Sequence, residues 1–291
     1  MKMQPHNENI ALTALINLLD EPDENAFRLI REKIRSLGME AIGPLENAWE
    51  NNFDPMVQDR IQDIIRQLQR ENLYSEFLNW VKHDASDLLK GFIMVTKTQY
   101  PSLDEQEIIA KIEQLRIEIW LELHENLTAL ENIKVLNRIL FDVHHFEGNN
   151  AHISIPRNSY INTFLESKKG SPLSLGILYM ILARKLELPV YGVNLPQHFI
   201  LAYLTDLGLE NPSEEDVLFY INPYHQGAVF TRREIELFIR QMKIKPESSF
   251  FSPCSNLDII QRLISSLVFS YNQLGYPDKI EDLDNLLNAF L

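Results

Sequence analysis

The sequence predicts a mostly helical α+β fold, in which a central helix packs on a small antiparallel sheet and further helices flank this core. Three observations support it. Apolar residues recur with helical spacing through the first 146 residues. Three apolar runs rich in β-branched and aromatic residues then follow between residues 190 and 221. Helical spacing returns after Thr231, so the strands form a meander between two helical regions.

The first region, residues 1–82, reads as four short amphipathic helices separated by turn residues. The second helix ends before Gly38, which suits a left-handed cap, and the fourth begins at Asp54–Pro55. Paired helices at a spacing of about forty residues are typical of HEAT-like repeats, although an ordinary helical subdomain has the same pattern. This region is expected to serve as a docking surface or a cap.

The second region, residues 83–250, is predicted to contain the core. Ser102 or Asp104 is expected to cap a helix, and a buried helix is expected to begin at Ser171–Pro172. The predicted strands, joined by turn-rich connections, cover residues 190–194, 198–204 and 217–221. In the third region, residues 251–291, two further helices over 257–271 and 279–291 are expected to pack on the core.

The composition narrows the classes of partner and the cellular location that are expected. The 291 residues include 27 Lys and Arg against 41 Asp and Glu, for a net charge of −14, which disfavours nucleic acid and anionic membranes as partners. A single cysteine, Cys254, precludes an intrachain disulfide. Neither a signal-length apolar segment nor a run long enough to span a bilayer is present in the sequence. A cytoplasmic location is therefore expected.

Metal and cofactor sites are not expected. His144, His145, Glu147 and His152 have suitable donor atoms for zinc, but adjacent residues on a helix point about 100° apart and do not readily converge on one ion. A helix end followed by a glycine turn is the simpler interpretation. The ten glycines are scattered and form no phosphate-binding loop.

The strongest candidate site combines Ser174, His198 and Asn222. A helix start, a strand histidine and a downstream Asx residue occur in the order found in Cys-His-Asp hydrolases of the papain or transglutaminase kind. In a thiol enzyme the helix dipole and a neighbouring imidazole lower the pKa of the cysteine. Ser174 occupies the expected position of that cysteine and gains little from the same dipole.

Two interpretations of these residues remain open. In the first, Ser174 attacks an acyl group, His198 is the general base and Asn222 orients it, although an amide cannot stabilise the imidazolium by charge. In the second, Ser174 is a polar residue of the first helical turn, His198 has local hydrogen bonds, and Asn222–Pro223 forms a turn. Cys254 comes after His198 and Asn222 in the chain, so it does not fit the Cys-His-Asp order of these enzymes.

Four segments in order resemble the SirB-one-like family, whose central region belongs to the transglutaminase-like superfamily: residues 158–162, 169–175, 186–199 and 220–227. The resemblance extends from about Asp84 to the C-terminus. It implies a transglutaminase-like (papain-like) core with a tetratricopeptide-like helical tail, and a cysteine that is commonly absent. His198 resembles the superfamily histidine, whereas Asn222 stands where the family usually has aspartate.

The leading hypothesis is a non-catalytic pseudoenzyme that acts as a protein- or peptide-binding, regulatory module. Its binding cleft would be formed by Ser171, Ser174, Gln197, His198, Asn222 and Tyr224. The alternatives are a hydrolase or acyltransferase using Ser174, His198 and Asn222, and a helical-repeat scaffold. No cofactor, nucleic acid or membrane partner is expected.

Overall fold

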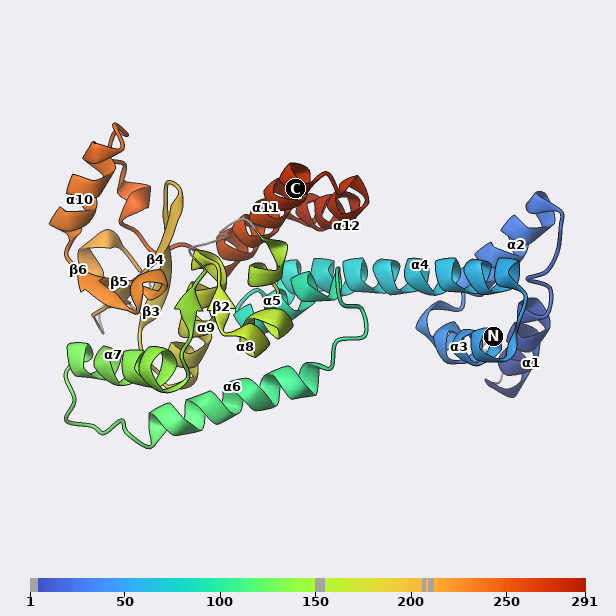
Figure 1. The fold of residues 1–291 in the computed structure, drawn as a ribbon, viewed down its shortest axis with the longest axis horizontal. Coiled ribbons are helices and arrows are strands. Elements are labelled where there is room, and N and C mark those ends of the chain that lie inside the picture. The colour runs from blue at the N-terminus through green and yellow to red at the C-terminus, as the bar shows by residue number, and fades with distance from the viewer. Residues whose placement is uncertain (1–4, 150–154, 206–207, 209–211) are drawn as a thin grey trace. The chain divides into compact units, whose positions relative to one another are not determined.

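The computed structural model describes residues 5–149, 155–205, 208 and 212–291. The chain divides into two compact units, residues 1–78 and residues 79–291 (Figure 1). Each unit has its own hydrophobic core, and the boundary falls in the last turn of a long helix.

Among the residues described, the N-terminal unit contains four α-helices: α1 Pro5–Ile16, α2 Glu24–Arg35, α3 Ile42–Asn51 and α4 Pro55–Asn79. Asp23 caps α2 by accepting a hydrogen bond from the backbone N–H of Asn25. Gly38 has φ +65°, the left-handed conformation expected after that helix. The core of this unit includes Leu19, Ile34 and Ile61, all fully buried. The assignment to HEAT-like repeats stays a prediction.

The C-terminal unit contains the other eight α-helices of the described chain: α5 Leu88–Lys97, α6 Glu105–Trp120, α7 Ala129–Asn137, α8 Ile161–Ser167, α9 Pro172–Lys185, α10 Arg232–Gln241, α11 Asn256–Leu274 and α12 Pro277–Leu287. Asp104 caps α6. Two π-helical segments, Trp80–Asp84 and Arg138–Val143, extend α4 and α7. Across the residues described, the search for a helix long and apolar enough to cross a membrane found none.

The main sheet is an antiparallel meander in the order β3 Val190–Leu195, β4 His198–Leu204, β5 Val217–Asn222 and β6 Ala228–Phe230. The first three strands match the predicted ones to within one residue, whereas β6 was not predicted. Two short strands, β1 Glu147–Gly148 and β2 Lys169–Gly170, pair in parallel. The predicted α+β class, a central helix on a small antiparallel sheet with flanking helices, is confirmed.

The two faces of the main sheet pack on different helices (Figure 1). Phe199 of β4 lies against Gly176 of α9. Ile200, the next residue, belongs to a separate core cluster with Ile235 and Ile239 of α10. Since successive strand residues point to opposite faces, α9 covers one face of the sheet and α10 the other.

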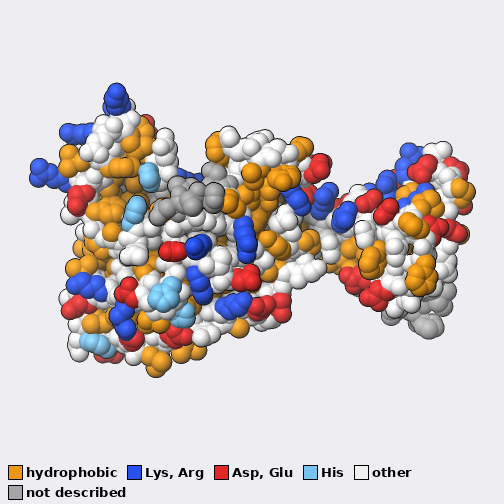
Figure 2. Space-filling model, viewed as in Figure 1, with side chains coloured by type: hydrophobic (Ala, Val, Ile, Leu, Met, Phe, Trp, Pro, Cys, Tyr) orange, Lys and Arg blue, Asp and Glu red, His pale blue; other side chains and the backbone are white. Residues whose placement is uncertain are grey.

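Charges of both signs are interspersed on the visible face of the C-terminal unit. Figure 2 shows blue and red side chains close together there, with apolar side chains between them. Ion pairs in this unit include Lys90 with Asp84 at 3.0 Å and Lys111 with Glu107 at 2.6 Å. This face therefore lacks the single-sign basic surface on which a phosphate backbone docks.

Candidate functional site

Ser174 is a structural part of the start of α9. Its side chain is fully buried. The Oγ atom accepts a hydrogen bond from the backbone N–H of Ser171 at 2.8 Å and donates one to the carbonyl of Asn158 at 2.7 Å. In turn, Ser171 Oγ accepts a hydrogen bond from the backbone N–H of Ser174 at 3.1 Å. The two serines thus form a reciprocal capping box with Pro172 in the first turn.

His198 begins β4 after a two-residue turn. Leu195 and His198 are paired across the hairpin, and Gln197 in the turn is exposed with φ +61°. The imidazole packs edge-on against the ring of Phe238 of α10, with 4.9 Å between the ring centroids. Burial lowers the pKa of His198, and the charges of His225 and Arg262 lower it further. The side chain is therefore mainly neutral at pH 7.

Ser174 and His198 lie on different sides of the sheet. Ser174 is in the helix that packs on the Phe199 face, whereas the ring of His198 contacts α10 on the opposite face. The hydrogen bonds of the Ser174 hydroxyl go to Ser171 and to the carbonyl of Asn158, so its hydrogen-bonding capacity is used at the helix start. A serine nucleophile with His198 as its base is not assembled in this structure.

The remaining predicted site residues, Asn222 and Tyr224, lie in a short turn at the end of β5. Asn222 ends β5 and its side-chain oxygen accepts from the backbone N–H of Tyr224 at 3.1 Å, as in an Asx turn. By strand alternation Asn222 shares the α10 face with His198. The ring of Tyr224 lies over Gly148 of β1, where an added Cβ would come within 2.5 Å of it. Burial raises the pKa of Tyr224.

Only some of the residues predicted to form the binding cleft lie together at the protein surface. Gln197, His198 and Asn222 are at least partly exposed, whereas Ser171 and Ser174 are buried. Residues that sequence reasoning did not select complete the surroundings of His198: Phe238, His225 and Arg262. His225 lies close to Asn222 in the sequence and could have been selected with it. No sequence pattern links Phe238 or Arg262 to His198, because only folding brings them near this residue.

Arg262 of α11 holds the turn before His198. Its guanidinium donates to Asn194 Oδ1 at 2.9 Å and to the carbonyls of Leu195 and His198 at 3.0 and 2.9 Å. Burial lowers the pKa of Arg262, and the three acceptors compensate for part of the cost of that burial. The position of His198 thus depends on a residue 64 positions later in the chain.

The other candidate residues have structural roles. His144 pairs with Glu118 of α6, and this pairing lowers the pKa of Glu118. Within the described residues, no group of three or more His, Cys, Asp or Glu side chains is arranged to hold a metal ion, and His152 lies outside them. Burial raises the pKa of Cys254 to about 12, so its thiol is a poor nucleophile.

Comparison with known protein families assigns the chain to a superfamily. The family model for the transglutaminase-like superfamily matches residues 106–265, more than half of the chain, and the protein belongs to this superfamily. The match extends from the start of α6 to the middle of α11 and includes Ser174, His198 and Asn222. The superfamily interpretation of the core is therefore confirmed.

Similar proteins occur in bacteria and animals. A UPF0162 protein of Xylella fastidiosa is 26% identical over 165 residues, which cover 55% of this chain and 54% of the relative. One from Pseudomonas aeruginosa is 23% identical over 202 residues, 69% of this chain and 70% of the relative. Human F-box only protein 21 is 26% identical over 160 residues, 55% of this chain and 25% of the relative. The chain thus spans about half the length of the first relatives, and no solved structure matches it.

Proposed function

We propose that this is a non-catalytic transglutaminase-like protein of the SirB-one type, which binds a protein or peptide in the cytoplasm. The observation that carries the proposal is the position of Ser174. Its hydroxyl is buried in a helix cap on the side of the sheet opposite His198. Without an assembled nucleophile and base, binding is the simpler use of the superfamily core.

The surface around His198 suits a peptide. The neutral imidazole offers one donor and one acceptor, and the exposed side chain of Gln197 offers an amide beside it. The ring of Phe238 supplies an apolar contact. Peptide-binding sites commonly combine such an aromatic contact with a few polar groups that fix orientation. HEAT-like N-terminal helices and a tetratricopeptide-like tail would add docking surface under the same proposal.

The proposal is tested with defined peptides. Peptides selected from a random library on the wild-type protein are titrated against His198→Ala and against His83→Ala, which makes the same change at an exposed site in a π-helical segment. We expect His198→Ala to weaken binding about tenfold, the loss of one or two polar contacts, and His83→Ala to leave it unchanged. Thermal unfolding of each variant verifies that it is folded.

Catalysis is tested in parallel. A serine-directed acylating probe is applied to the wild-type protein, and labelled sites are mapped by mass spectrometry. We expect no label on Ser174, because its hydroxyl is buried and already donates to the carbonyl of Asn158. Equal peptide affinity in wild type and His198→Ala would contradict the binding surface, and labelling of Ser174 that depends on His198 would contradict the non-catalytic assignment.

A further inference from the structure

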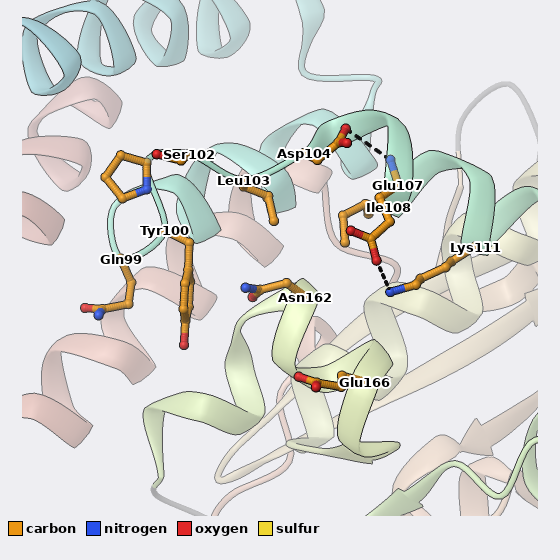
Figure 3. A pocket seen from close by; sticks show the side chains of 11 residues that line it. Gln99, Tyr100, Ser102, Leu103, Asp104, Glu107, Ile108, Lys111, Asn162 and Glu166 are labelled. Carbon is orange, nitrogen blue, oxygen red and sulfur yellow. Dashed lines mark hydrogen bonds and ion pairs between the residues drawn. The ribbon is translucent and has the colours of Figure 1, made fainter. Parts of the chain in front are cut away.

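A second pocket lies in the C-terminal unit, away from the residues considered so far. Its volume is about 650 Å³, within the usual range for ligand sites. The connection from Gln99 to Asp104, the first turns of α6 and one face of α8 form its walls (Figure 3). None of the predicted site residues lines it.

Most charged groups at the pocket are already paired. Glu107 forms an ion pair with Lys111 at 2.6 Å, one turn apart on α6. Asp104 accepts from the backbone N–H groups of Gln106 and Glu107 as the cap of that helix. Glu166 on α8 differs, since its exposed carboxylate has no hydrogen bond or ion pair with any described residue. Glu166 is thus the lining carboxylate whose oxygens are open to a donor from a ligand, whereas those of Asp104 serve the helix cap.

A second polar group in the same wall lacks a partner. Asn162 lies four residues before Glu166, so the two side chains project from the same face of α8. The Oδ1 atom of Asn162 is buried and has no hydrogen-bond partner among the described residues. An unpaired buried acceptor costs roughly 1–3 kcal/mol, and a donor brought by a ligand would remove that cost.

An aromatic ring faces these two acceptors. Figure 3 shows Tyr100 edge-on, with one face of its ring turned toward Asn162 across the pocket. The ring of Tyr160 packs against that of Tyr100 at nearly right angles, with 5.6 Å between the ring centroids. An aromatic face attracts a cation placed above it, and most strongly a planar guanidinium that can stack on it.

We propose that this pocket binds the guanidinium group of an arginine side chain carried by a peptide. The five N–H donors of a guanidinium can reach the Glu166 carboxylate and the Asn162 amide oxygen while its plane stacks on Tyr100. One carboxylate that is used neither in an ion pair nor in a helix cap matches a single cation, whereas a polyamine needs several. The net charge of −14 also favours a basic ligand. Only the peptide source of the arginine rests on the proposed function, because guanidinium binding by the pocket is independent of the His198 surface.

The proposal is tested by titrating the 291-residue chain with defined probes. Binding is monitored by calorimetry and by NMR of the backbone amides. The probes are a capped Gly-Arg-Gly tripeptide, the Gly-Lys-Gly and Gly-Glu-Gly analogues, and spermidine. We expect the arginine peptide to bind most tightly and to shift amide signals of residues 99–111 and 161–167. The glutamate peptide should not bind. Tighter binding of spermidine than of the arginine peptide would overturn the peptide source.

Three variants locate the binding. Glu166→Gln should weaken arginine binding about tenfold by removing the charge-assisted contact, and Asn162→Leu should weaken it severalfold. Glu247→Gln removes one negative charge from an exposed loop and serves as the matched control, with no expected change. Unaltered affinity in Glu166→Gln, or an absence of binding by the wild-type protein, would overturn the proposal. Failure of His198→Ala to alter peptide binding would instead count only against the proposed function.

Discussion

Phe199 of β4 lies so close to Gly176 of α9 that a Cβ atom on the glycine would come within 2.5 Å of the phenylalanine ring. The same ring is also close to Gly192 of β3, where an added Cβ would lie 2.7 Å away. Phe199 is therefore held between a helix and a neighbouring strand. This packing determines that the side chain before it, His198, points away from α9.

Gly176→Ala is expected to destabilise the protein by about 1–3 kcal/mol, the usual cost of overpacking a core. The ring of Phe199 cannot move aside freely because Gly192 borders it on another side. Alanine's better helix propensity, worth roughly 1 kcal/mol, offsets only part of this cost. Urea denaturation measures the change in the free energy of unfolding.

The control for this prediction is a double-mutant cycle with Phe199→Leu. A smaller side chain leaves room for the added methyl group, so Gly176→Ala should cost less in the Phe199→Leu background than in the wild type. Equal costs in both backgrounds would show that the contact between residues 176 and 199 is not the source of the destabilisation.

Ser174→Ala is expected to destabilise the protein by about 1–3 kcal/mol, since it removes two buried hydrogen bonds, from the N–H of Ser171 and to the carbonyl of Asn158, and leaves these two groups only their own 3.2 Å bond. Ser255→Ala is the matched control, because Ser255 caps α11 in the same kind of capping box but is exposed. Loss of that exposed cap should cost about 1 kcal/mol. If Ser174→Ala were as stable as the wild type, the structural role given to this hydroxyl would be wrong.

Much of the fold was predictable from local signals. Ser171–Pro172 indicates a helix start, and the structure has a capping box there. The face on which His198 lies was not predictable, because β4 is apolar at nearly every position and its alternation gives no inward or outward side. The short strand β6 was missed because three residues give too little pattern, and the pocket beside Tyr100 was missed because its walls are about sixty residues apart in the chain.

Arg262→Leu is expected to destabilise the protein by about 2–4 kcal/mol and to loosen the turn before His198. The substitution keeps apolar bulk but removes the donors to Asn194, Leu195 and His198. Hydrogen exchange of the backbone amides of residues 195–199 measures the local effect. Arg240→Leu, an exposed arginine near the end of α10, is the control and should leave exchange at the turn unchanged.

The stability contributed by His198 is expected to depend on pH. Burial, together with the charges of His225 and Arg262, lowers its pKa in the folded protein, so the unfolded chain binds a proton more readily. The contribution is therefore fully present above the unfolded pKa of about 6.5 and decreases as the pH falls from there toward the folded pKa. Between about pH 7.5 and 5.5, the free energy of unfolding should fall more steeply in the wild type than in His198→Gln.

NMR titration of the imidazole Cε1 proton of His198 measures the folded pKa directly. Because His225 contributes to the shift, His225→Gln should raise the pKa of His198 toward its ordinary value without restoring it, since burial is the larger cause. A midpoint at or above about 6.5 in the wild type would contradict the packing of this ring against Phe238, because a solvated imidazole would titrate there.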